Sequence, residues 1–338
     1  MKAPSIHFYG VAVQAIYFAA LYVLIRRKCK QEILKPENLI HSLLLGSVGI
    51  CLLGIMQYLN YGLIVRSIQL PPSQGLWGFY LIDWIMIPIQ HAHARVYSLF
   101  YAPPMYGLYL SLLLPLSLYC LQQAQSRKAQ ALWCLVVGLI SLNLLMSFTR
   151  IAWIAAAISC LIYMLRYGSR PLWRSISGGA LLLVCLSFLW PPLWQHAWQR
   201  IQSILSLTHH SNVGRLEIWS KSWQVFWQKP LTGHGFFSFA SLFPQWRGLW
   251  PHSHSMLLQS LLETGLISTS LFYGFLLSCV KKWGQQPLHW ACACSLLAYM
   301  ICGWVDHVAF DARNVFVFWL VLAIGSLPSR QQKLTILQ

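Results

Sequence analysis

The fold class of this chain is indicated by residues 99–122, which read LFYAPPMYGLYLSLLLPLSLYCLQ and contain no charged side chain. Such a run can cross the apolar part of a lipid bilayer as a helix, because about 20 apolar residues suffice. The whole chain of 338 residues is 57% hydrophobic and only 9% charged, whereas a soluble domain carries about 25% charged residues. This composition excludes a soluble globular enzyme, a disordered chain and a free nucleic-acid-binding domain.

Further apolar runs lie on both sides of this segment, and Arg, Lys, Pro or polar clusters separate them. They fall near residues 6–25, 39–58, 131–147, 151–165, 175–190, 256–279, 288–305 and 314–327. Runs of this length and composition are typical of transmembrane helices. The sequence therefore predicts an all-α, polytopic transmembrane bundle of about nine spans, with residues 1–338 forming a single integral membrane domain.

Basic residues predict the orientation of these helices, because Lys and Arg in short loops mark the cytoplasmic side of a membrane. If the cluster at 26–35 lies inside, alternation also places the other basic clusters inside, at residues 127–128, 166–174, 281–282 and 330–333. We therefore expect the N-terminus outside and the C-terminus inside. The formal net charge of +17 then reflects membrane topology rather than a nucleic-acid partner.

Two long segments fall on the predicted outer face, at about 59–98 and 191–255. Long loops are usually functional or disordered, and the Trp, Phe and Leu content of these two favours partial packing at the membrane interface. We expect 191–255 to be a partly helical periplasmic loop between the sixth and seventh spans that carries part of the active site.

Paired histidines also gather on this predicted face, as His91-x-His93, His209-His210 and His252-x-His254. An H-x-H on an extended segment directs both rings to one side, which can suit zinc if a third ligand is near. The external carboxylates that could supply that ligand are Asp83, Glu217, Glu263, Asp306 and Asp311. No second spaced ligand signature supports a metal, so we expect none. A neutral His that accepts a proton is the favoured interpretation, because imidazole titrates near working pH.

A block that begins at Asn212 predicts a helix from about 213 to 228. Apolar side chains recur there at helical spacing, as Leu216, Trp219, Trp223 and Phe226, and Asn212 is a plausible N-cap. Pro230 ends the helix, and Gly233-His-Gly235 supplies a turn. An amphipathic helix on the membrane surface, with Arg215 reaching lipid headgroups, would account for the stripe. It would not account for the Gly-x-Gly turn or the following His252-Ser-His254.

Four stretches at predicted external faces follow one another along the chain. They are Arg95-Val-Tyr-Ser-Leu-Phe-Tyr-Ala-Pro-Pro104, Ser147-Phe-Thr-Arg150, Gly214-Arg-Leu-Glu-Ile-Trp219 with Pro230-Leu-Thr-Gly-His-Gly235, and His252-Ser-His-Ser-Met-Leu-Leu-Gln-Ser-Leu-Leu-Glu-Thr-Gly265. In this order they resemble the motifs of the O-antigen ligase and polymerase superfamily of lipid-linked glycan transferases, over about 90–325. Ser255 stands where that family has Asn, and Ala102 and Pro104 stand where it has two asparagines.

The resemblance implies a membrane glycosyltransferase that moves a glycan from undecaprenyl diphosphate to an acceptor hydroxyl at the periplasmic face of the bacterial inner membrane. An O-antigen ligase with the lipid A core as acceptor is the first expectation. A polysaccharide polymerase and a protein O-glycan ligase are the alternatives. The implied partners are the lipid-linked donor, a lipid A core or glycan acceptor, and membrane lipids, without nucleic acid or a cofactor.

Residue chemistry assigns roles within this expectation. A departing lipid diphosphate needs positive charge where negative charge develops, and arginine supplies it through bidentate contacts with phosphate oxygens. The candidate donor-binding residues are Arg215, Arg150, Arg95 and Arg313, and the candidate catalytic residues are His254, His252 and Glu263. His254 is the expected base. Glu263 is expected to hold an arginine or a loop rather than to touch the base. No D-x-D motif occurs, so we expect metal-independent transfer.

Two other classes of membrane protein remain open. Abundant Trp and paired external His could indicate a haem-handling protein, although its W-G-x-x-W-x-W-D run is absent. A lipid-glycan flippase would need charged residues inside the spans, whereas nearly all charges here lie at the predicted helix ends. A haem absorbance spectrum tests the first of these classes, and reconstitution with donor and acceptor tests the second.

Overall fold

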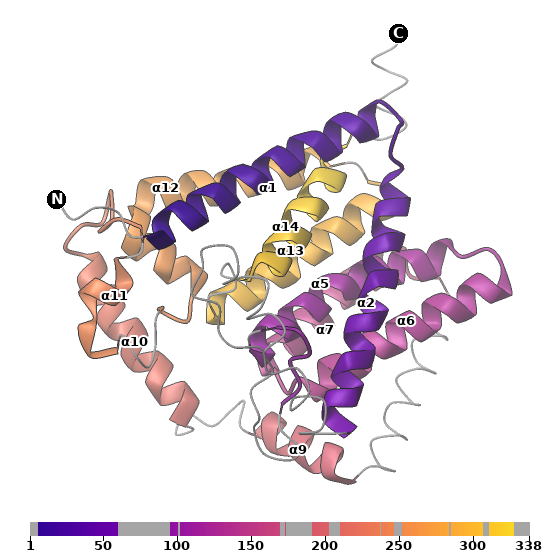
Figure 1. Cartoon of the computed structure of the whole chain (residues 1–338), viewed down its shortest axis with the longest axis horizontal. Coiled ribbons are helices and arrows are strands. Elements are labelled where there is room, and N and C mark those ends of the chain that lie inside the picture. Colours follow the sequence, from indigo (N-terminus) through magenta and orange to yellow (C-terminus); the bar gives the residue numbers. More distant parts are fainter. Residues whose placement is uncertain are drawn as a thin grey trace. The chain divides into compact units, whose positions relative to one another are not determined.

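The computed structural model describes residues 6–59, 95–100, 102–169, 173, 191–202, 210–236, 238–246, 252–283, 285–306 and 311–327. Within these ranges every regular element is a helix and no strand occurs (Figure 1). In the described part of the chain, six helices are long and apolar enough to cross a membrane: α2 (Pro36–Leu59), α5 (Pro103–Gln123), α6 (Arg127–Met146), α7 (Arg150–Tyr167), α12 (Met256–Lys282) and α13 (Pro287–Val305). The chain is therefore an all-α, multi-pass membrane protein, as the composition predicts.

The predicted apolar runs coincide with helices wherever the structure describes them. The first run corresponds to α1 (Ile6–Lys30), and the last corresponds to the shorter apolar helix α14 (Ala312–Gly325). The run at 175–190 and the histidines His91, His93 and His209 lie outside the described residues. The segment 191–255 is partly helical, as expected, and contains α9 (Pro191–Gln202), α10 (His210–Phe226), α11 (Phe239–Leu242) and the 3-10 turn η1 (Pro244–Trp246).

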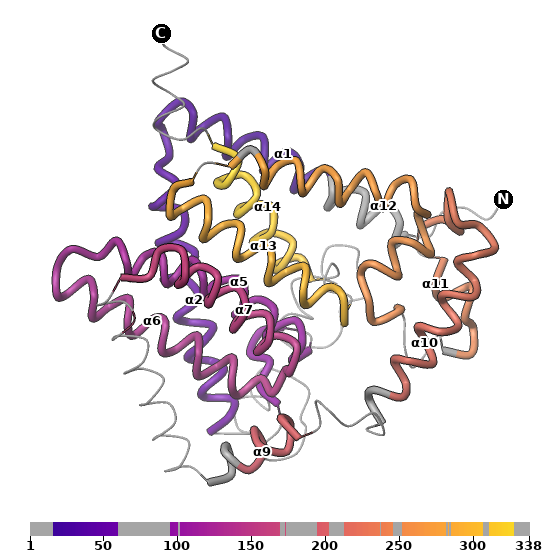
Figure 2. Tube along the Cα trace, turned by 180° about the vertical axis from the view of Figure 1, so that it is seen from behind, coloured from indigo at the N-terminus to yellow at the C-terminus, as the bar shows by residue number. Residues whose placement is uncertain are grey.

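The chain divides into two compact units. One comprises Lys35–Ile204 and Trp290–Tyr299 and is built around α5, which packs against α6, α7 and α2 (Figure 2). Every side chain of α5 from Met105 to Leu121 is buried. The two prolines that open this helix, Pro103 and Pro104, suit its first turn because the N–H groups there need no partner within the helix.

The other unit comprises Met1–Leu34, Leu205–His289 and Met300–Gln338. In it α1 packs along α14, and α10 packs against α12. Its apolar core under α10 consists of Ile218, Phe226, Phe239, Phe243 and Leu262. This core fixes one face of α10 against the start of α12, where the H-x-H segment lies.

Two details of the predicted helix at 213–228 are wrong. α10 already includes His210, so Asn212 lies inside the helix rather than at its N-cap. The predicted apolar stripe is also divided, because Phe226 is buried whereas Leu216 and Trp223 are exposed. The apolar arc of α10 is wider than its contact with α12, so only the side that carries Ile218 and Phe226 reaches the core.

Candidate active site

The H-x-H segment is a short non-helical stretch that leads into α12. Ser255 caps this helix, because its Oγ accepts a hydrogen bond of 3.3 Å from the N–H of Leu258. Ser and Asn are both good N-caps, so Ser255 can perform the capping that an Asn would perform at this position. His254 has a φ of 52°, a left-handed conformation that is uncommon for a residue other than glycine. Such strain persists only where the surroundings enforce it.

Those surroundings are a set of hydrogen bonds to Ser253, the residue between the two histidines. The N–H of Ser253 donates to Oε1 of Gln259 at 2.8 Å, and its carbonyl accepts from Nε1 of Trp219 at 3.0 Å. Nε2 of Gln259 donates in turn to Oε1 of Glu263 at 2.7 Å. Ser253, Gln259 and Glu263 are all buried. Glu263 is therefore linked to the backbone beside His254 through Gln259, which supports a positioning role for this carboxylate.

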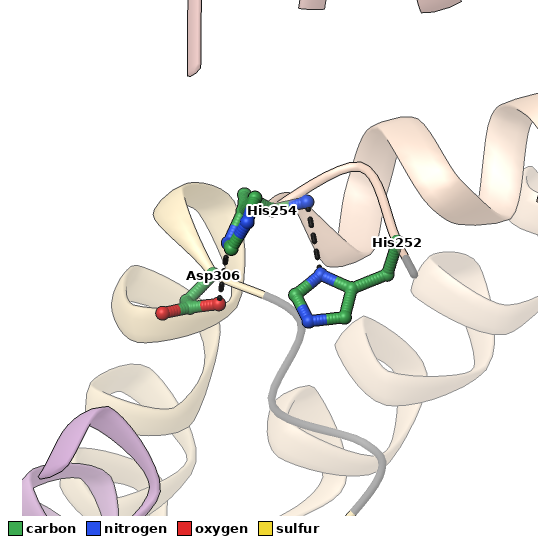
Figure 3. A group of neighbouring side chains, drawn as sticks. All are labelled: His252, His254 and Asp306. Carbon is green, nitrogen blue, oxygen red and sulfur yellow. Dashed lines mark hydrogen bonds and ion pairs between the residues drawn. The ribbon is translucent and has the colours of Figure 1, made fainter. Parts of the chain in front are cut away.

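Two side chains from distant parts of the sequence, those of His254 and Arg215, meet at the carboxylate of Asp306. Asp306 follows the end of α13, and its Oδ1 lies 3.3 Å from Nδ1 of His254. Its other oxygen, Oδ2, lies 3.8 Å from Nη2 of Arg215 on α10. Figure 3 shows the ring of His254 directed at Asp306, with His252 beside it. The structure thus brings together the predicted base, a predicted donor-binding arginine and an acidic residue.

The charge on Asp306 fixes the direction of its bond to His254. Burial raises the pKa of this carboxyl, but the hydrogen bond and charge of His254, with the charge of Arg215, outweigh burial and hold the pKa at about 2. Near neutral pH Asp306 is therefore ionised and can only accept a hydrogen bond. Nδ1 of His254 must donate, so in the neutral ring Nε2 carries the lone pair. The side chain of His254 is 22% exposed, so a substrate can approach it.

His252 differs from its neighbour. Its Nδ1 accepts a hydrogen bond of 3.2 Å from the backbone N–H of His254 (Figure 3). Burial, with the charges of His254 and Arg215, lowers the pKa of His252 to about 4, although Asp306 acts in the opposite sense. His252 is therefore neutral at pH 7, and its hydrogen is on Nε2 because Nδ1 is an acceptor. This arrangement supports a role in holding the backbone of His254.

The turn at Pro230–Gly235 docks against a kink in α12. Gly265 interrupts this helix with a φ of 73°, which leaves backbone groups on both sides of the kink without helical partners. The turn satisfies them through four backbone hydrogen bonds: His234 to the carbonyl of Leu262 (2.9 Å), Gly235 to that of Glu263 (2.8 Å), and, in return, Leu266 to that of Pro230 (2.8 Å) and Ile267 to that of Leu231 (3.3 Å). The interpretation as an amphipathic surface helix did not account for the Gly-x-Gly turn. The turn Pro230–Gly235, which follows α10, is hydrogen-bonded to α12, and we call this connection the clasp between α10 and α12.

Two glycines make this close approach possible. A Cβ at Gly233 would overlap the carbonyl of Glu263, and a Cβ at Gly265 would overlap the carbonyl of Leu231. Both glycines also have positive φ values, of 69° and 73°, which side chains other than glycine rarely adopt. Because α10 carries Arg215 and α12 follows His254, this clasp helps to fix the distance between the two side chains.

Arg313, another predicted donor-binding residue, lies in the same unit but is engaged differently. Its Nε and Nη2 donate to the two oxygens of Asp311 at 2.9 and 2.6 Å, and Asp311 also caps α14. A bidentate pair of this kind is strong, whereas the 3.8 Å contact between Arg215 and Asp306 is longer than a hydrogen bond. Arg215 is therefore the better placed of the two to accept a phosphate.

Arg95 and Arg150 belong to the other unit, where two of the quoted motifs meet. Arg95 donates from Nε to the carbonyl of Ser147 at 3.2 Å and from Nη2 to Oγ1 of Thr149 at 3.0 Å. It thereby holds the turn Ser147–Thr149, in which Phe148 has a φ of 47°. Arg150 is the first residue of α7, directly after this turn. Donor binding by these two arginines remains a prediction.

Several residues of the site were not assigned these roles from the sequence. Gln259 lies four residues before Glu263, so the contact between their side chains on one helix face could have been inferred from spacing. Trp219 was interpreted only as part of an apolar stripe and of a family motif, and Asp306 only as a possible metal ligand. Their contacts join residues far apart in the chain, and no local pattern indicates such pairs.

Comparison with known protein families agrees with the quoted motifs. Residues 131–273 match the model of the family described as O-Antigen ligase, so this part of the chain is similar to that family. This match confirms the resemblance seen in the sequence and supports a membrane glycosyltransferase of the O-antigen ligase and polymerase type. The matched segment includes Arg150, Arg215, His254 and Glu263, whereas Asp306 lies beyond it. No curated protein matches the chain.

Proposed function

We propose that the chain transfers a glycan from undecaprenyl diphosphate to an acceptor hydroxyl at the periplasmic face of the bacterial inner membrane, as an O-antigen ligase with the lipid A core as acceptor. The observation that carries this proposal is the meeting of His254 and Arg215 at the two oxygens of Asp306. A base and a cation for the leaving group are the two functions that such a transfer needs.

In the proposed reaction the acceptor oxygen attacks the anomeric carbon of the lipid-linked glycan. The bond from that carbon to the diphosphate oxygen breaks, and its electrons leave with undecaprenyl diphosphate. Nε2 of His254 accepts the hydroxyl proton, and the imidazolium that forms is stabilised by ionised Asp306 through Nδ1. An ionised carboxylate that orients a histidine and stabilises its charged form serves the same purpose in hydrolytic triads.

The arginines supply positive charge to the departing diphosphate in this proposal. Arg215 is the leading candidate, because its side chain is 22% exposed and its guanidinium is not held in a short bidentate pair. Arg150, Arg95 and Arg313 are further candidates, the first two from the family motifs that contain them. Asp306 faces His254 and Arg215, and Asp311 faces Arg313. These pairings support transfer without a divalent ion, and transfer should accordingly survive exhaustive chelation with EDTA.

The test is reconstitution of the purified chain in proteoliposomes with a lipid-linked glycan donor. Three acceptors are offered separately: a lipid A core, a glycan and a protein. Transfer to the lipid A core is expected, and it should fall in Asp306→Asn. His41→Gln, a change on α2 in the other compact unit, should leave transfer intact. Transfer only to the glycan or only to the protein would replace the ligase proposal by a polymerase or a protein ligase. No transfer to any of the three would refute the proposed activity.

A further inference from the structure

The cluster of His252, His254 and Asp306 has a second chemical property besides holding a base. Each residue offers one ligand atom, and these atoms all lie within 4.8 Å of one another (Figure 3). We propose that this triad is a reversible, inhibitory binding site for a zinc-like divalent transition-metal ion. The binding itself rests on the triad alone, and only the inhibition rests on the proposed function.

The donor set selects the class of ion. Two imidazole nitrogens and one carboxylate oxygen are ligands that Zn²⁺ accepts, and three protein ligands leave the fourth tetrahedral position to water. Mg²⁺ and Ca²⁺ prefer oxygen ligands, of which the triad offers only the one carboxylate. The site is therefore expected to take Zn²⁺ or Co²⁺ and to discriminate strongly against Mg²⁺.

The geometry requires little rearrangement. Ligand atoms bound tetrahedrally to one zinc ion at about 2.0–2.1 Å lie about 3.3–3.4 Å apart. Shifts of about 1 Å or less in each side chain would bring the ligand atoms, which lie within 4.8 Å of one another, to that separation. The imidazole rings already lie with centroids 4.4 Å apart. The backbone between them is fixed by the hydrogen bonds of Ser253 to Gln259 and Trp219. Ion binding would therefore cost little conformational entropy of the backbone.

Asp306 can bind the ion and keep its contact with Arg215. Its Oδ1 faces His254 and its Oδ2 faces Arg215, so an ion would take Oδ1 in place of the His254 hydrogen bond. The nearby guanidinium repels a divalent cation and weakens its binding. This repulsion is the reason to expect an ion that a chelator removes rather than a resident cofactor.

Binding would remove the proposed base whichever ring nitrogen of His254 is used. If Nε2 binds the ion, its lone pair is no longer available for the acceptor proton. If Nδ1 binds the ion, the ring hydrogen must move to Nε2, which then becomes a donor. In both cases His254 cannot accept a proton, so the bound ion should stop transfer.

The test measures ion binding directly on the purified full chain in detergent, after EDTA treatment and desalting. Zn²⁺ is titrated in competition with a fluorescent zinc indicator, and the visible spectrum of added Co²⁺ reports its coordination. We expect one ion per chain. His254→Gln and Asp306→Asn should each weaken binding by more than about 100-fold, because loss of an outer partner alone costs about 10–100-fold.

The matched control is His41→Gln, which also removes one histidine but leaves the triad intact, and its affinity should equal that of the unchanged protein. Millimolar Mg²⁺ should not displace Zn²⁺. Thermal unfolding of each variant checks that it is folded, and His252→Gln provides an independent ligand variant. Binding that is equal in all the variants, or effective competition by Mg²⁺, would overturn the proposed site.

A second arm adds Zn²⁺ to the glycan transfer assay. Zn²⁺ should abolish transfer, and EDTA should restore it. The Zn²⁺ concentration that halves transfer should correspond to the affinity found in the binding titration. Direct binding by a chain that shows no transfer would retain the metal site and reject the proposed function. Transfer that persists at saturating Zn²⁺ would reject the inhibition.

Discussion

Nδ1 of His254 lies 3.3 Å from Oδ1 of Asp306, although 52 residues separate the two in the chain. The histidine comes from the segment before α12 and the aspartate from the end of α13. Because Asp306 is ionised near neutral pH, it fixes the ring tautomer and leaves Nε2 of His254 as the acceptor. These two residues are therefore sufficient to make Nε2 of His254 a proton acceptor.

The first prediction separates this base from the binding of the donor. His254→Ala removes the proton acceptor but leaves the arginines, so donor binding should persist while turnover falls by roughly 10²–10⁴-fold. His252→Ala should have a milder effect, because it removes a support of His254 rather than the base. Glycan transfer in membranes is measured beside donor binding for each variant. Near-normal turnover in His254→Ala would mean that acceptor deprotonation does not pass through this residue.

The second prediction concerns the charge on the leaving group. Arg215→Ala should weaken donor binding and lower turnover by roughly 10²–10³-fold, the cost of losing one group that stabilises the transition state. Arg215→Lys should recover only part of both, because an ammonium cannot make the bidentate contact of a guanidinium. Lys221→Ala, on the same helix but in an exposed pair with Glu217, is the matched control. Full activity in Arg215→Ala would remove this residue from the proposed mechanism.

The spans could be predicted from the sequence because each apolar run is long and continuous, as for α5. The faces of α10 could not, since its apolar arc exceeds its contact with the core and only the fold decides which part is buried. The presence of His254 and Arg215 in one site was predictable from the order of the family motifs. Their link through Asp306 was not, because it joins side chains from α10, the segment before α12 and the end of α13.

The third prediction tests the clasp between α10 and α12. Gly265→Ala places a Cβ against the carbonyl of Leu231 and forces a left-handed backbone on alanine, which alone costs about 1–3 kcal/mol. The variant should unfold at a lower temperature and lose transfer. Gly274→Ala in the same helix has open space at its Cβ and serves as the control. Equal thermal stability of the two variants would show that the close approach at Gly265 does not constrain the fold.

The fourth prediction follows from the lowered pKa of His252. This residue has a pKa of about 4 in the folded protein and about 6.5 in an unfolded chain, so between these values the unfolded chain binds more protons. The titration of His252 should therefore leave the free energy of unfolding unchanged above about pH 6.5 and should lower it as the pH falls toward 4. Thermal unfolding in detergent across this range measures the effect. His252→Asn should show a shallower dependence on pH, and an unchanged slope would contradict the assignment.

The last prediction concerns the side of the membrane on which the site lies. The alternating basic clusters predict that residues 191–255 lie in the periplasm and residues 281–287 in the cytoplasm. A cysteine introduced as Ser211→Cys should therefore react with an impermeant thiol reagent in intact spheroplasts, and one introduced as Gln285→Cys should react only after lysis. Cys134, the exposed cysteine among those that the structure describes, is first replaced by alanine to lower the background. Labelling of Gln285→Cys but not Ser211→Cys in intact cells would place the site in the cytoplasm, where a periplasmic transfer reaction is impossible.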